Sequence, residues 1–284
     1  MLQKILLLLA AAVLLLPCPG LASDQGDQGM LHVLGMGPSG PDLTAPRALE
    51  TLKEADIVLG HRDTYETFQE FIPKEKYAFN PWEGIHGGNA TKLRKQNRAK
   101  WLERVKERRK ELRNFALKRI KQGQDLVIMD SGDPCVYGPA LYWLLQDFPR
   151  EHLEVIPGMS AFNAASAALE QPMIGKAGFV VLTSPHSLLR DNGTGTQVLE
   201  DMAEHTPTMV LYMALKPINQ LVEQMKRDGY PMDLPAAVVY FAGYPDKEKV
   251  VRGNLQNIGA KIESRNEDWL GLVIIGEAVS RTAG

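Results

Sequence analysis

Apolar runs that end in turns containing Gly, Pro or Asp recur along this 284-residue chain. Such runs are closed by Gly35-Met36-Gly37-Pro38, Ser131-Gly132-Asp133-Pro134, Pro157-Gly158-Met159-Ser160 and Tyr212-Met213-Ala214. Gly lets a ligand approach the backbone closely and Pro fixes a turn, so strand ends of this kind expose amides and carbonyls at one edge of an open α/β sheet. The recurrence predicts one composite ligand-binding cleft.

Strand-like and helix-like segments alternate between these turns. We expect strands over 30–36, 57–59, 126–129, 153–156, 179–183, 209–212, 236–241 and 272–275, and helices over 42–55, 139–148, 160–169 and 218–227. Thr44 lies near the cap of the first helix. The alternation predicts an α/β fold with a mainly parallel sheet in its first part. We place a domain boundary close to Gly158, which gives α/β domains over 29–158 and 159–284.

The first residues have the pattern of a secretory leader. Lys4 precedes an unbroken apolar run over 5–16, and small residues precede Ser23. This pattern predicts a signal peptide over 1–22, cleavage near Ala22-Ser23 and export to the periplasm. A spanning helix needs ~20 apolar residues, so no stable membrane anchor is expected. Cys18 leaves lipoprotein processing open.

Removal of the leader leaves Cys135 as the only cysteine. One cysteine excludes an internal disulfide and a cysteine-based metal cluster. The six histidines are scattered, so no metal cofactor is implied. We expect Cys135 to be a small buried apolar side chain.

The segment 92–121 is strongly basic, with fourteen Lys and Arg against three Glu. An apolar stripe at helical spacing, Trp101, Val105, Leu112, Ala116 and Ile120, predicts one long amphipathic helix. Its charge is compatible with a solvated face or with an electrostatic funnel for an acidic ligand such as a tetrapyrrole with several carboxylates. Nucleic acid and an anionic membrane surface fit the charge as well.

The run from Gly35 to Gly40 also satisfies the G-x-G-x-x-G pattern of dinucleotide-binding folds. Such a site needs an acidic residue at the end of the second strand, where it binds the ribose. Here Asp56 stands at the beginning of that strand, and Pro38 removes an amide that a pyrophosphate would use. The pattern alone therefore does not support a dinucleotide site.

The motifs resemble the tetrapyrrole (corrin/porphyrin) methylases, the S-adenosylmethionine (SAM)-dependent family of uroporphyrinogen III, precorrin and cobalt-precorrin methyltransferases. The strongest match is Ser131-Gly132-Asp133-Pro134-Cys135-Val136-Tyr137-Gly138, which is close to the family's S-G-D-P-x-x-Y-G. Pro157 to Ala161 matches P-G-x-S/T-A/S, and Thr208 to Met213 matches T-x-V-x-Y-M. In the first turn Ser39-Gly40 replaces the family's Gly-Asp. The resemblance extends from Met30 to about Val279.

The resemblance implies two α/β domains with SAM in the cleft between them, a tetrapyrrole substrate and a homodimer. It implies cofactor-binding roles for Pro38, Ser131, Gly132, Asp133, Val136, Ser160, Ala161, Met213 and Gly243. The implied reaction is methylation of an electron-rich ring carbon, with release of S-adenosylhomocysteine. No nucleic acid is expected as a partner.

Catalytic residues are less clearly marked. His61 follows the second strand, where uroporphyrinogen methylases carry an Asp, and it is our candidate for a catalytic base. A carboxylate-pairing role for the neighbouring Arg62 is an equal alternative.

The leader conflicts with a SAM-dependent reaction, because SAM is kept in the cytoplasm. The second hypothesis is therefore an exported, non-enzymatic tetrapyrrole- or haem-binding protein on the same fold. An RNA ribose methyltransferase or a diphthine synthase, both on this fold, comes third, and the basic segment is compatible with RNA.

Overall fold

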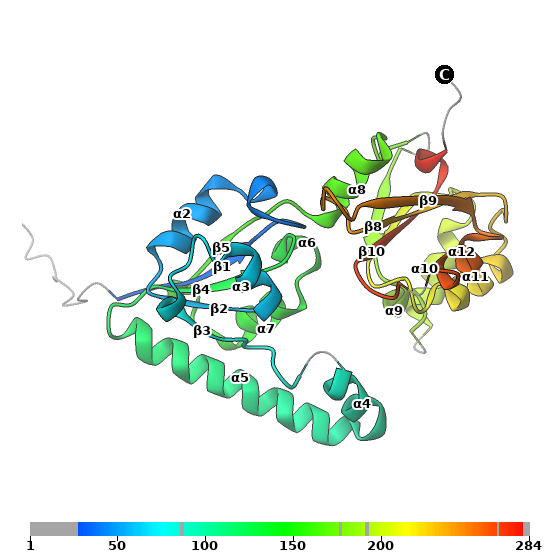
Figure 1. The fold of residues 1–284 in the computed structure, drawn as a ribbon. Helices are drawn as coiled ribbons and strands as arrows, with labels where there is room; N and C mark the ends of the chain where they lie inside the picture. Colours follow the sequence, from blue (N-terminus) through cyan, green and yellow to red (C-terminus); the bar gives the residue numbers. More distant parts are fainter. Residues whose placement is uncertain (1–27, 86–87, 176–177, 191–192, 266, 281–284) are drawn as a thin grey trace, which may run out of the picture.

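The computed structural model describes residues 28–85, 88–175, 178–190, 193–265 and 267–280. Two α/β domains lie side by side and are joined where the last strand of the first sheet leads into α8 (Ala161–Leu169) (Figure 1). The predicted signal peptide, its cleavage site and Cys18 lie outside the described residues. Within the described ranges, no helix has both the length and the apolar character needed to cross a membrane.

The first domain is built on a parallel five-stranded sheet in the order β3-β2-β4-β1-β5. Its strands are β1 (Leu31–Gly35), β2 (Ile57–Gly60), β3 (Tyr77–Phe79), β4 (Leu126–Asp130) and β5 (Leu153–Ile156). Side chains that alternate along the central strands are buried on both faces, as a sheet covered by two helical layers requires.

One face of this sheet packs against α2 (Pro46–Glu54) and α3 (Arg62–Phe68), and the other against α5 (Arg98–Ile120) and α7 (Pro139–Asp147). The neighbouring strands β1 and β4 therefore send their connections to opposite faces. This arrangement is a topological switch point, where open α/β sheets bind ligands in the crevice beyond the carboxyl ends of the strands.

The second domain contains a mixed sheet in the order β6-β7-β10-β8-β9. Its strands are β6 (Val180–Thr183), β7 (Thr208–Leu211), β8 (Pro235–Tyr240), β9 (Lys249–Asn254) and β10 (Gly271–Ile275), and its helices are α8 (Ala161–Leu169), α9 (Pro185–Leu188), α10 (Thr194–Met202), α11 (Ile218–Arg227) and α12 (Ile258–Glu263). The central strand β10 is antiparallel to both of its neighbours.

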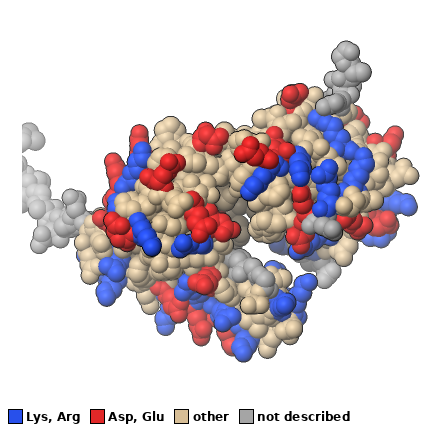
Figure 2. Space-filling view, in the orientation of Figure 1, with Lys and Arg blue, Asp and Glu red and all other residues tan. Residues whose placement is uncertain are grey.

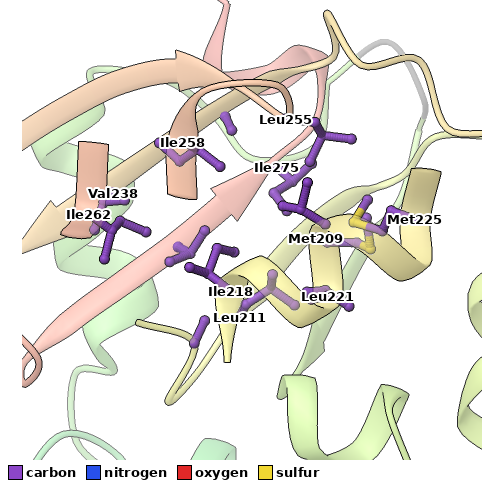
Figure 3. Packing of buried hydrophobic residues seen from close by; sticks show 14 of the residues in the cluster. Met209, Leu211, Ile218, Leu221, Met225, Val238, Leu255, Ile258, Ile262 and Ile275 are labelled. Carbon is purple, nitrogen blue, oxygen red and sulfur yellow. The ribbon is translucent and has the colours of Figure 1, made fainter. Parts of the chain in front are cut away.

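The two faces of the second sheet carry separate apolar clusters. On one face, α11 and α12 pack against the sheet through side chains that include Ile218, Leu221, Met225, Ile258 and Ile262 (Figure 3). On the other, Ala164, Ala165 and Leu169 of α8 pack against β8 and β10. Helix α8 therefore belongs to the second sheet, although its first residues lie near the first.

The basic segment forms two helices, so the prediction of one long helix was wrong. Helix α4 (Gly88–Gln96) ends before α5, and Asn97 between them has φ −149° and ψ 86°. The Asn97 side chain accepts a hydrogen bond from Lys100 N at 3.0 Å and caps α5. The predicted stripe is otherwise confirmed: its last four members are buried and Trp101 is half-buried.

Thr44 does not cap the first helix, which begins at Pro46 after Ala45. Its hydroxyl donates instead to Met36 O at 2.7 Å and lies 2.9 Å from Gly40 O. The residue is buried and holds the turn after β1 closed. A local pattern cannot separate these two uses of a threonine hydroxyl, because both satisfy backbone groups near a helix start.

Candidate active site

Three glycines bring the ends of β1, β4 and β5 into backbone contact. A Cβ added to Gly35 would stand 2.4 Å from Gly158 N, and one added to Gly158 would stand 2.5 Å from both Gly132 O and Gly35 O. Two hydrogen bonds, Gly132 N to Gly37 O at 2.7 Å and Gly37 N to Gly132 O at 3.2 Å, tie the first two turns together. The first three sequence motifs therefore form one continuous backbone surface around Gly35, Gly132 and Gly158, which we call the glycine floor.

The turn after β4 presents predicted cofactor residues above this floor. Asp133 caps α6 (Pro134–Tyr137) by accepting a hydrogen bond from Cys135 N at 2.9 Å, while Ser131 and Val136 are exposed. Gly132 has φ +77°, and the nearest atom to a Cβ there would be Ala161 N at 4.0 Å. Space thus lies beside Gly132, between the turns after β4 and β5.

Cys135 is exposed, which corrects the prediction of a buried side chain. It stands in the first turn of α6, whose short length leaves it at the surface. Desolvation and the neighbouring Asp133 raise the pKa of its thiol, which favours the protonated form.

Ser160 lies at the junction of the two domains. Its side chain is only 3% exposed, accepts a hydrogen bond from Phe162 N at 3.3 Å, and shares one of 2.7 Å with the Tyr212 hydroxyl. Ser160 is therefore the predicted cap of α8 as well as a link to the end of β7. The Tyr212 ring stacks on Tyr137 of α6, with centroids 4.9 Å apart and planes 6° from parallel.

Met213 and Gly243 follow the carboxyl ends of β7 and β8, at the edge of the second sheet that contacts the first domain through Gly243 and Tyr212. Met213 has φ +56° and is 46% exposed. Gly243 has φ +85°, and a Cβ there would stand 2.8 Å from Leu43 Cδ1 and 3.1 Å from Pro38 Cγ. The turn after β8 therefore packs directly on the turn after β1.

Apolar side chains from both domains are exposed around these turns. Val136 and Tyr137 of the first domain are 37% and 42% exposed, Met159 at the domain junction is 38% exposed, and Met213 is exposed as well. The Ser39 hydroxyl is buried and has no hydrogen-bond partner in the described part of the chain. A ligand with an apolar body and polar groups that backbone can bind fits this donor set, and SAM is such a ligand.

His61 lies on the first domain's side of the same edge. It immediately follows β2 and precedes α3, and its Nδ1 is 3.4 Å from Asn80 Nδ2. Partial burial lowers the pKa of the imidazole below its ordinary 6.5. Arg62 pairs with Glu66 at 2.8 Å and lies over Tyr65 and Tyr77, so its guanidinium is bound within its own domain.

Asp130 is a titratable group that sequence reasoning missed. It ends β4, and because Gly60 pairs with Met129, His61 and Asp130 are the next residues on adjacent strands. Burial, with a smaller contribution from Asp133, raises the pKa of its carboxyl to about 6. The available signal was an acidic residue at the end of an apolar strand, directly before a Ser-Gly-Asp-Pro turn.

Many cations of the basic segment are bound within the first domain. Arg108 donates to Asn80 O and Pro81 O, and Arg109 and Arg113 bind Asp147 of α7. Exposed cations of the basic segment gather at the corner where α4 meets α5, namely Lys92, Arg94, Lys95, Arg98 and Lys100. In the shared orientation of Figures 1 and 2, α4 lies below the hollow between the two domains.

Eight of the nine predicted cofactor residues lie in the turns at the strand ends described above. The ninth, Pro38, lies in the turn after β1 and packs against Gly243. No group of three or more His, Cys, Asp or Glu side chains in the described ranges is placed to bind a metal ion.

Solved structures share this fold. A cobalt-precorrin-4 methyltransferase superposes with a TM-score of 0.71 at 22% identity, over 88% of this chain and 96% of the other. A uroporphyrin-III C-methyltransferase from Thermus thermophilus, complexed with S-adenosylhomocysteine, gives 0.62 at 23% identity, over 88% and 99%.

Sequence relatives agree with these structures. The chain is 27% identical over 255 residues to the cobalt-precorrin-4 C(11)-methyltransferase of Methanocaldococcus jannaschii, which covers 87% of each protein. It is 24% identical over 258 residues to the uroporphyrinogen-III C-methyltransferase of Bacillus subtilis, covering 89% of this chain and 49% of that protein. The family model for tetrapyrrole (corrin/porphyrin) methylases matches residues 30–259. The chain therefore belongs to the tetrapyrrole methylase family.

Proposed function

We propose that this protein is a SAM-dependent C-methyltransferase that acts on a tetrapyrrole of the precorrin type. The strongest support is that the strand ends of the two domains lie next to each other. The glycine floor of the first domain is there adjacent to the Met213 and Gly243 turns of the second. Relatives named as cobalt-precorrin-4 and uroporphyrinogen-III methyltransferases support the reaction class.

The residues present fit the cofactor. The turn from Ser131 to Val136, the start of α8 at Ser160 and Ala161, and the turns at Met213 and Gly243 would hold SAM, with Pro38 closing the site above Gly243. Bound SAM supplies an electrophilic methyl group. The chain supplies mainly position, since the Tyr137–Tyr212 stack joins the two edges and the Ser160–Tyr212 hydrogen bond orients the Tyr212 side chain.

His61 is our candidate for the group that accepts a ring proton after methyl transfer. Its lowered pKa keeps the imidazole neutral, and therefore able to accept a proton, at neutral pH. Asp130 stands at the next position of the adjacent strand, and burial raises the pKa of its carboxyl to about 6.

We also propose export through the leader and assembly as a homodimer. The leader is the observation that favours a second function, an exported tetrapyrrole-binding protein without turnover. Mass spectrometry of the protein from the periplasmic fraction tests the first point, since a mature chain beginning at Ser23 is expected. Light scattering of the purified protein tests the dimer.

The test of the enzymatic proposal is calorimetric titration with S-adenosylhomocysteine, followed by transfer of radiolabelled methyl from SAM to uroporphyrinogen III and to cobalt-precorrin-4. Met213→Arg places a long cation in the proposed cofactor site, and Val198→Arg on α10 is a control of matched exposure, 45% against 46%. We expect binding and transfer in the wild type and the control but not in Met213→Arg. Tetrapyrrole binding without S-adenosylhomocysteine binding would instead favour the carrier.

A further inference from the structure

The strand between the two proposed cofactor turns of the second sheet is β10. Antiparallel pairing places Val273 opposite Leu211 of β7 and Gly271 opposite Tyr240 of β8. The amino end of β10 therefore lies at the same edge as the carboxyl ends of its neighbours. The two residues before it, Trp269 and Leu270, lie between the Met213 turn and the Gly243 turn, and Phe241 N donates to Leu270 O at 2.8 Å.

Trp269 is exposed at this edge although nothing in the local fold requires it there. Its relative exposure is 60%, whereas Trp82 is 5% exposed and Trp101 and Trp143 are half-buried. No aromatic ring of the described residues packs on its indole. Leu270 beside it is 43% exposed, so the two side chains form an exposed apolar patch in the middle of the edge.

The backbone of this edge adopts a sparsely populated conformation on three adjacent strands. Met213, Leu270 and Phe241 have φ of +56°, +53° and +49°, and they are three of the five described residues other than Gly with positive φ. Such conformations are strained for residues other than Gly, and they concentrate where a chain holds a ligand. The concentration of strained residues therefore marks this edge as a candidate ligand-binding surface.

Two ion pairs with exposed lysines flank the indole; Asp268 is exposed as well, whereas Glu267 is partly buried. Lys216, which follows β7, pairs with Asp268 at 2.6 Å, and Lys249, the first residue of β9, pairs with Glu267 at 3.6 Å. A lysine thus stands on each side of Trp269, held by an acidic neighbour of the same loop. A flat ring with carboxylates around its rim matches this arrangement, because the indole would cover the ring face and the lysines would pair with the rim.

We propose that Trp269 is a substrate-binding residue that stacks on one face of the tetrapyrrole, with Lys216 and Lys249 paired to its peripheral carboxylates. This inference rests on the proposed function. The adenine of the cofactor is a different occupant for the same indole, but its expected place, beside Gly243, is bounded by Leu43 and Pro38 rather than open to solvent.

The test compares two ligands on three variants. Trp269→Ala removes the platform, Trp269→Phe retains an aromatic face, and Phe179→Ala is a control at the opposite edge of the same sheet, 41% exposed before β6. Dissociation constants are measured for S-adenosylhomocysteine by calorimetry and for uroporphyrin III by its absorbance. We expect Trp269→Ala to weaken uroporphyrin binding about three- to tenfold, with Trp269→Phe within about twofold of wild type.

S-adenosylhomocysteine affinity should be unchanged in all three variants, which also shows that they are folded. An unchanged uroporphyrin affinity in Trp269→Ala would overturn the inference and leave the proposed function standing. Loss of S-adenosylhomocysteine binding alone would assign the indole to the cofactor. A wild-type protein that binds neither ligand would overturn the proposed function itself.

Iodide quenching gives a second readout that needs no tetrapyrrole. Iodide should quench the fluorescence of the exposed Trp269 equally well without and with saturating S-adenosylhomocysteine. Protection by S-adenosylhomocysteine, lost in Trp269→Phe, would place the indole against the cofactor and contradict the inference.

Discussion

Replacing Asp130 by Asn should stabilise this protein in a pH-dependent way. Burial raises the pKa of the Asp130 carboxyl from 3.8 to about 6. Folding therefore favours the protonated form, and the ionised form present at neutral pH is destabilising. At ~1.4 kcal/mol per pKa unit, a rise of about two units corresponds to about 3 kcal/mol of stability lost to ionisation.

The sign and window follow from proton binding. Between pH 3.8 and about 6 the folded state holds more protons on Asp130 than the unfolded state, so this contribution to stability falls as pH rises through that range and is constant above it. An Asn at this position carries no charge at any pH and retains an oxygen to accept the hydrogen bond from Ser131 N.

The assay is urea unfolding followed by circular dichroism between pH 4 and 8. We expect Asp130→Asn to exceed the wild type by about 3 kcal/mol at pH 8, and the difference to shrink toward zero near pH 4. The exposed Asp201→Asn on α10 reports any general effect of removing one negative charge. A difference that does not change with pH, or a less stable Asp130→Asn at pH 8, would refute the reasoning.

Further predictions concern the cleft. Gly243→Ala should weaken S-adenosylhomocysteine binding in calorimetry, because its methyl would stand 2.8 Å from Leu43 Cδ1 at a strained φ of +85° and would displace the turn. Ser160→Ala should lower the free energy of unfolding by about 1 kcal/mol in urea, since it removes a helix cap and the partner of Tyr212; an equal loss in Tyr212→Phe would assign the effect to their shared hydrogen bond. The acid limb of the methyl-transfer rate should lie below pH 6.5, the ordinary pKa of His61, and should vanish in His61→Asn; an unaltered limb would remove His61 from catalysis.

Local pattern predicted much of the fold. The helix Ile218–Arg227 and the strand Leu153–Ile156 have the predicted bounds, because clear periodicity and flanking breakers mark both. The break at Asn97 was missed, since its cap depends on a backbone turn that a continuous run of helix-forming residues conceals. The insertion of β10 between β7 and β8 is a long-range pairing that no local signal records.

The site was predicted as motifs rather than as a surface. Turns with Gly, Pro and Asp at strand ends are readable because their backbone demands are local. Exposure is not local: Cys135 and Trp269 are residue types that are usually buried, and only the assembled edges show them open. Asp130 belongs to the same class, because its altered pKa arises from the neighbours that folding brings around it.

The contact among Gly35, Gly132 and Gly158 makes one part of the cleft intolerant of substitution, whereas the rim tolerates it. With carbonyl and amide atoms 2.4 to 2.5 Å from where side chains would begin, any other residue at Gly35 or Gly158 separates strands that the whole first domain shares. The rim has no such restriction, since Trp269, Lys216 and Lys249 are exposed and carry no shared strand contact through their side chains. Substitutions at the rim can therefore change which ligand the cleft accepts, while the backbone contacts at Gly35 and Gly158 leave no room for a side chain.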